Sequence, residues 1–141
     1  MKKLLYLGIL LILGSCGSNV ESTTTIVYVD GREVLTIKIG NLEVMAEDLK
    51  IRSKYGRGFF DFEEAKKVCE NLGDGWRLPT KDELNVLYKN KDKIGGFAGI
   101  SYWSSTEVDN FYAWIQDFGD GFQDGNGKVT YSLNVRAVRA F

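Results

Sequence analysis

The sequence of 141 residues predicts an α+β domain, made of a strand meander, two helices and a group of short strands. The β-rich runs 26–29 and 34–39 flank Asp30-Gly31, which is a strong hairpin signal, and 42–45 continues the meander. The last 41 residues hold nine of the eighteen aromatic residues, separated by Asp-Gly and Asn-Gly turn dipeptides. The strands expected there lie near 102–105, 111–118, 128–132 and 134–140.

Two segments in the middle of the chain predict helices that begin at a capping side chain. Asp61 and Thr80 each stand three residues before a glutamate, which is the spacing of a capping box. Gly73 is expected to end the first helix. The second helix has an apolar face made of Leu84, Leu87 and Tyr88. This face is expected to pack on the core.

Residues 1–16 predict the signal peptide of a lipoprotein. A basic start precedes the apolar run 4–13, which is too short to cross a bilayer core of about 30 Å but suits the hydrophobic region of a secretory signal. The sequence Leu-Gly-Ser-Cys at 13–16 resembles the lipobox of bacterial lipoproteins, which implies acylation of Cys16. The alternative is a plain signal peptide cleaved near Ser15, with the cysteine incidental.

The rest of the chain is expected to be a tether and one domain. Residues 17–25 are small and polar, which suits a flexible tether, and 26–141 are expected to form the domain. Residue 17 is glycine and not the aspartate of enteric lipoproteins retained in the inner membrane, which favours a lipid-anchored outer-membrane location, open to display on the cell surface. With Cys16 acylated, Cys69 has no disulfide partner, and its place in a helical repeat predicts a buried thiol.

The composition argues against several classes of function. The chain has no histidine, so it holds neither a Ser-His-Asp nor a Cys-His nucleophile system and no imidazole ligand for zinc. A net charge of −1 offers nucleic acid no attractive field. The acidic pairs at 63–64 and 82–83 fall in first turns of expected helices, where capping explains them. We therefore expect neither an enzyme nor a nucleic-acid partner.

Several sequence blocks occur in an order known from one family. They are DG (30–31), IKIGN (37–41), MAEDL (45–49), GWRLPT (75–80), YWSST (102–106), AW (113–114) and VRAVR (135–139). Over 26–141 they resemble the Fibrobacter succinogenes major paralogous domain and the related Lcl C-terminal-like domain of a collagen-like bacterial adhesin. The resemblance implies a C-type-lectin-like fold in an exported protein of Bacteroidetes or their relatives, with ligand binding or adhesion as the usual role.

The same resemblance implies which residues bind a ligand and which belong to the structural scaffold. Some relatives are diversified by retroelements in this final segment, where Trp103 and Trp114 would belong to the invariant scaffold. Arg77, Arg136 and Arg139 are expected to hold the scaffold through buried ion pairs, with an anion site as the alternative. The expected ligand-binding residues are Glu107, Asp109, Phe111, Tyr112, Gln116, Phe118, Asp120, Phe122, Asp124 and Asn126. Their aromatic rings suit either a contact surface or the interior of a small domain.

The carboxylates of this segment could be ligands of calcium, a hard cation that takes several oxygens. Its oxygen donors are Asp117, Asp120, Asp124 and Asn126. The EF-hand order is not followed, since Phe122 stands two residues after Asp120, and the Glu-Pro-Asn and Trp-Asn-Asp ligands of sugar-binding lectins are missing. Turn carboxylates in solvent explain these residues, so we expect no metal and no cofactor.

These inferences predict a non-enzymatic binding module, lipid-anchored to the cell envelope. It would hold an extracellular or envelope protein or a glycan through the loops of 107–131, and contact the membrane through its acyl anchor. The alternative is a structural or assembly lipoprotein of the outer membrane without an exchangeable ligand.

Overall fold

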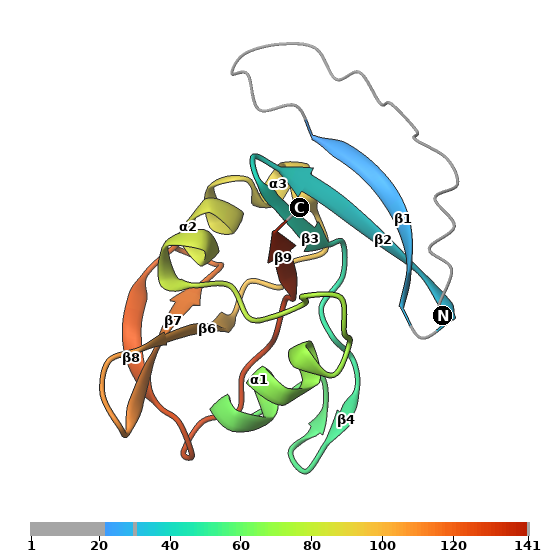
Figure 1. Cartoon of the computed structure of the whole chain (residues 1–141). Helices are drawn as coiled ribbons and strands as arrows, with labels where there is room; N and C mark the ends of the chain where they lie inside the picture. Colours follow the sequence, from blue (N-terminus) through green and yellow to red (C-terminus); the bar gives the residue numbers. More distant parts are fainter. Residues whose placement is uncertain (1–21, 30, 141) are drawn as a thin grey trace.

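A computed structural model describes residues 22–29 and 31–140, and within them the α+β class is confirmed. The first and last described strands share an antiparallel sheet of order β1-β2-β3-β9 (Figure 1). Its strands are β1 (Thr23–Val29), β2 (Arg32–Ile39), β3 (Leu42–Met45) and β9 (Val138–Ala140). The predicted hairpin and meander are therefore confirmed, while 134–140 contributes only a short strand at its end.

The segment expected to be a tether overlaps the first strand. β1 begins at Thr23, and Thr23, Thr24 and Thr25 pair with Lys38, Ile37 and Thr36 of β2. The predicted signal peptide, with Cys16, and the greater part of the segment 17–25 lie outside the described residues.

A second antiparallel sheet carries the aromatic part of the chain. It consists of β6 (Ser101–Glu107), β7 (Tyr112–Asp117) and β8 (Gln123–Gly127), in that order. The expectation of a strand over 128–132 is wrong, because the third strand is the glycine-rich segment that we expected to form turns. A Cβ atom on Gly125 would lie 3.1 Å from Cγ2 of Val108, so this glycine serves a close approach and not a turn.

Both predicted helices form, and both begin at the expected residue. In α1 (Phe62–Glu70) the Asp61 side chain accepts the backbone N–H of Glu64 at 2.9 Å. In α2 (Lys81–Lys89) both hydrogen bonds of the capping box at Thr80 are present. Gly73, with φ of 71°, follows the end of α1. A third, single-turn helix, α3 (Lys91–Ile94), and the two-residue strands β4 (Arg52–Ser53) and β5 (Gly56–Arg57) complete the elements.

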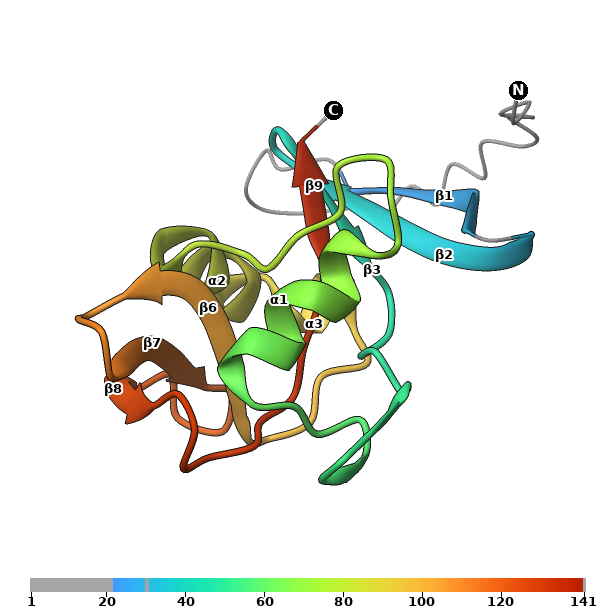
Figure 2. The same cartoon turned by 60° about the horizontal axis from the view of Figure 1, so that its bottom comes forward.

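The interior has two apolar clusters. One surrounds α1 and includes Phe62 and Trp103, whose rings meet edge to face at 5.6 Å, and α1 lies between the two larger sheets (Figure 2). The other joins β2 and β3 to α2 and includes Tyr102 and Phe118. Every buried residue of the described chain lies between Thr25 and Val138, so a fragment of residues 22–141 keeps all of them.

Candidate functional site: an apolar surface at one end of the β6–β7–β8 sheet

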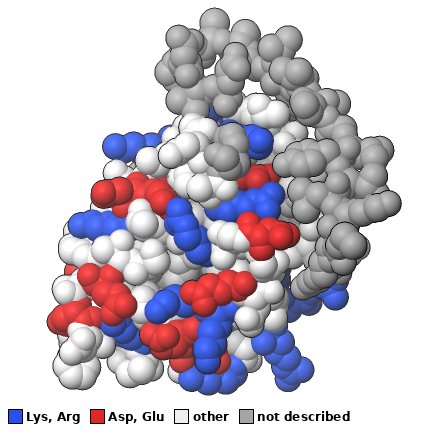
Figure 3. All heavy atoms as spheres, in the orientation of Figure 1, with Lys and Arg blue, Asp and Glu red and all other residues white. Residues whose placement is uncertain are grey.

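Exposed apolar side chains gather where the β6–β7 loop meets the segment that follows β8. The backbone N–H of Val108 donates to the carbonyl of Tyr112 at 2.9 Å, and that of Lys128 to the carbonyl of Phe111 at 2.9 Å. Phe111 is 75% exposed and Val129 80% exposed. We call these exposed residues the tip surface: Val108, Phe111, Tyr112, Val129 and Tyr131. Uncharged atoms cover the corner where the β6–β7 loop projects (Figure 3).

Lys128 holds the two segments of the tip surface together. Its side chain is almost fully buried, and its ammonium pairs with the carboxylate of Glu107 and donates to the carbonyls of Asp109 at 2.8 Å and Asn110 at 3.3 Å. The hydrogen bond from Lys128 is the largest cause of the lowered pKa of Glu107. Both charges therefore contribute to a fixed conformation of the loop.

Asp109 also serves the conformation of this loop. Its carboxylate accepts the backbone N–H groups of Phe111 at 2.7 Å and Tyr112 at 2.9 Å, as in an Asx turn. These bonds project the Phe111 ring away from the core. Glu107 and Asp109, two of the expected ligand-binding residues, thus lie at the candidate site, where their side chains hold the loop in shape.

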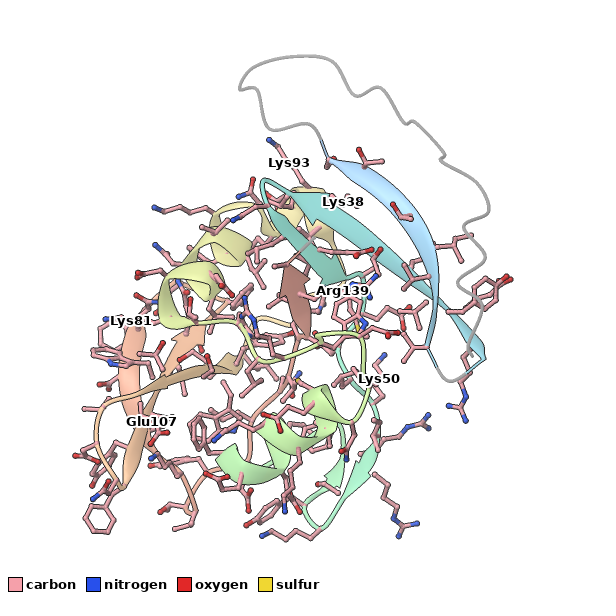
Figure 4. All side chains as sticks on the ribbon, in the orientation of Figure 1. Lys38, Lys50, Lys81, Lys93, Glu107 and Arg139 are labelled. Atoms are coloured by element: carbon pink, nitrogen blue, oxygen red, sulfur yellow. The ribbon has the colours of Figure 1, made fainter. Side chains whose placement is uncertain are left out.

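The tip surface continues along one face of β7 toward α2. Tyr112 and Trp114 lie on the same face of β7, opposite Gly127 and Gly125 of β8, so no side chain of β8 stands directly opposite either ring. The Lys81 ammonium lies 3.3 Å from the centroid of the Trp114 ring, a cation–π contact. Figure 4 shows Lys81 and Glu107 at the same outer edge of this sheet. The site therefore combines aromatic rings, a cation and a strand with glycines opposite the rings.

The structure does not bring all ten predicted binding residues together. Glu107, Asp109, Phe111 and Tyr112 lie at the tip, and half-buried Asn126 pairs with Ala113 beside them. Asp120 and Phe122 lie at the other end of β7 and β8, beyond the pair formed by Gln116 and Gln123, and Asp124 is exposed between the two ends.

Two of the predicted binding residues are wrong, because the structure buries them. Gln116 has no exposed surface, and its amide donates to Asn85 Oδ1 and to the carbonyl of Gly121, each at 3.1 Å. Phe118 is 2% exposed and stacks on Phe97 with ring centroids 4.4 Å apart. Their alternation with polar residues resembled that of a loop, but α2 and the segment 95–100 cover them.

The tip surface also includes residues that the sequence did not single out as binding residues. Val108, Val129 and Tyr131 are exposed there, and Lys81 and Trp114 extend the same face. The local sequence holds no signal for Val129, whose exposure depends on the bend after β8.

The residues expected in the scaffold agree with the prediction only in part, since the ion pair of Arg77 is half-exposed. Trp103 is buried, whereas Trp114 is only half-buried. Each of the three arginines pairs with a carboxylate at 2.8 Å: Arg77 with Glu83, Arg136 with Asp48 and Arg139 with Glu43. The Cys69 thiol is buried, and burial raises its pKa to about 12.

The carboxylates considered for calcium are used by turns. Asp117 Oδ1 accepts the backbone N–H of Gly119 at 2.7 Å, and Asp120 Oδ1 accepts that of Phe122 at 2.9 Å. Within 22–29 and 31–140, no three acidic or cysteine side chains come together as metal ligands. In the same part of the chain no helix is long and apolar enough to span a membrane.

Comparison with known protein families identifies the family of this chain. The family model of the Lcl C-terminal domain matches residues 40–139. The chain belongs to this family. The matched part of this Lcl C-terminal domain runs from the β2–β3 turn to β9 and includes the tip surface and the three arginine pairs, whereas β1 and β2 precede it. No curated protein matches the chain.

Proposed function

We propose that this Lcl C-terminal domain is a non-enzymatic binding module of the cell envelope, which holds a protein or glycan partner on the tip surface. The observation that carries the proposal is the exposure of Phe111 and Val129 on two segments that Lys128 fixes from below. A contiguous apolar surface is costly in water and is typical of contact sites. A surface that is ordered beforehand loses less entropy on binding.

The proposal includes a C-type-lectin-like fold and a lipid anchor. The fold assignment rests on the sequence blocks and is supported by first and last strands that share a sheet, with the binding loops carried by a second sheet. The anchor rests on the lipobox at 13–16, with acylation of Cys16 and location in the outer membrane. The tip surface would then face a partner outside the lipid layer.

The binding test compares two ends of the same sheet in the purified domain, residues 22–141. The probes are an array of immobilised glycans and detergent-solubilised cell-surface proteins. We expect Phe111→Ser with Val129→Ser to weaken binding at least about tenfold, since such anchors each contribute more than about 1 kcal/mol. Phe122→Ser, which alters a 63% exposed ring at the other end of β7 and β8, is the matched control and should leave binding unchanged.

Either of two results would contradict the proposed site. If Phe122→Ser abolishes binding and the tip variant does not, the partner sits at the other end of the sheet. If no probe binds the wild-type domain, an assembly role without an exchangeable ligand replaces recognition. Melting temperatures of the variants show whether a loss of binding reflects unfolding.

A second prediction concerns the side of the membrane on which the domain lies. We expect protease treatment of intact cells to remove a C-terminal tag from the full-length chain, because recognition of an external partner requires surface display. Lysed cells are the control for cleavability, and a periplasmic protein is the control for intactness. Protection until lysis would place the domain in the periplasm and favour envelope assembly.

A further inference from the structure

The hairpin of β4 and β5 with its flanks is a second exposed surface that the proposed site does not use. Its segment 50–57 reads KIRSKYGR, with four cationic residues and no acidic one, in a chain whose net charge is −1. Lys and Arg side chains occupy the lower edge of the molecule over this hairpin (Figure 3). The segment is therefore positively charged, whereas the whole chain is slightly negative.

Within the part of the chain that the structure describes, three of these four cations have no carboxylate partner. Lys54 pairs with Asp61 at 2.7 Å, but among the described residues Lys50, Arg52 and Arg57 form no ion pair. Together with Gly56 they line a surface hollow of about 550 Å³. Unpaired like charges around one hollow repel each other, and a bound anion would relieve this repulsion.

The hairpin holds these cations in a defined arrangement. Arg57 Nε donates to the carbonyl of Lys50 at 2.9 Å, which leaves the outer nitrogens of the guanidinium free for a ligand. The Ser53 hydroxyl contacts the carbonyls of Gly56 and Phe59 and accepts the backbone N–H of Tyr55 at 3.0 Å. These hydrogen bonds fix the turn and thereby the shape of the hollow.

Apolar side chains are also exposed along this hairpin and its flanks. Ile51, Tyr55 and Phe59 expose 45%, 43% and 41% of their surfaces. A soluble anion would be bound by the cations alone, and its binding would not explain why these three apolar side chains are exposed. Basic residues mixed with aliphatic and aromatic ones are typical of proteins that rest on the boundary between headgroups and acyl chains.

We propose that the β4–β5 hairpin docks on the surface of a membrane that contains anionic phospholipid. Lys50, Arg52 and Arg57 surround a headgroup phosphate, while Ile51, Tyr55 and Phe59 enter the headgroup boundary. This contact is separate from the tip surface, and it would hold the domain against the lipid independently of an acyl chain.

The test is sedimentation of the unacylated domain, residues 22–141, with lipid vesicles. Vesicles of phosphatidylcholine mixed with phosphatidylglycerol are compared with vesicles of phosphatidylcholine alone, at low and at high salt. We expect binding to the mixed vesicles that weakens with salt. Arg52→Glu with Arg57→Glu should reduce it by at least about 30-fold, because each lost cation near an anionic surface contributes about fivefold and each new anion adds repulsion.

Two control variants separate membrane docking from charge effects. Lys89→Glu with Lys93→Glu makes the same change in net charge on exposed residues elsewhere, Lys93 lying far from Lys50 in Figure 4, and should leave binding near the wild-type level. Ile51→Ser with Tyr55→Ser keeps all four cations and should weaken binding to the mixed vesicles several-fold, most visibly at high salt.

Three results would overturn the proposal. The first is absence of binding to mixed vesicles, and the second is equal loss in the two charge-reversal variants, which would indicate a non-specific field. The third is tight binding of a soluble anionic polysaccharide together with unchanged vesicle binding by Ile51→Ser with Tyr55→Ser. That result would make the hairpin a polyanion site instead of a membrane contact.

Discussion

Asp48→Asn is expected to lower the free energy of unfolding by about 3–5 kcal/mol, because it leaves a buried guanidinium without its counter-charge. Arg136 has no exposed surface, and its Nε donates to Asp48 Oδ1 at 2.8 Å. Its Nη1 donates to the carbonyls of Met45 at 3.0 Å and Gly95 at 3.1 Å, so these uncharged acceptors would remain when the carboxylate charge is lost.

The Asp48 carboxylate joins more than one element, which adds to the expected loss. Its Oδ2 accepts the hydroxyl of Tyr102 at 2.7 Å and the amide of Asn134 at 3.2 Å. Burial, with the hydrogen bond to Asp48, raises the pKa of Tyr102 to about 12, so the phenol stays protonated and donating at neutral pH. Asp48 thus connects the loop after β3 to β6 and to the segment before β9.

The measurement is urea denaturation of the domain, followed by tryptophan fluorescence. Glu83→Gln is the matched control, because it neutralises the partner of the half-exposed Arg77 and keeps a capping side chain. It should cost no more than about 1 kcal/mol. Equal losses for the two variants would show that burial of Arg136 does not govern the strength of its pair.

Phe118→Ala is expected to destabilise the domain by about 3–5 kcal/mol, the usual cost of removing a buried aromatic ring. The ring stacks on Phe97 at 4.4 Å and contacts Tyr102 at 4.7 Å and Tyr88 at 5.6 Å between centroids. The deletion would leave a cavity among three aromatic rings, none of which can collapse without leaving its other contacts.

Phe122→Ala provides the comparison for this prediction. It removes the same ring from an exposed position four residues later, and such surface changes usually stay within about 0.5 kcal/mol. In thermal unfolding, Phe118→Ala should therefore lower the melting temperature by more than about 10 °C and Phe122→Ala by only about 2 °C. If Phe118→Ala melts like the wild type and loses a ligand, Phe118 is a contact residue after all.

The sequence by itself predicted the elements that short-range interactions determine. The hairpin of β1 and β2 and the caps at Asp61 and Thr80 depend on residues within a few positions of one another. The buried Cys69 followed from helical spacing, and the family blocks placed the three arginines in the scaffold. Local hydrogen bonds and periodicity suffice for such features, because no distant partner has to be known.

Only the tertiary structure decided which face of the last strands is covered. Gly125 lies in a strand, where its lack of a side chain lets Val108 approach closely, and the ring of Phe118 points inward against Phe97 and Tyr102. The exposed Phe122 has the same type of side chain in a similar polar setting. Burial depends on contacts between residues far apart in the chain, so side-chain chemistry and local spacing could not separate a core ring from a contact ring.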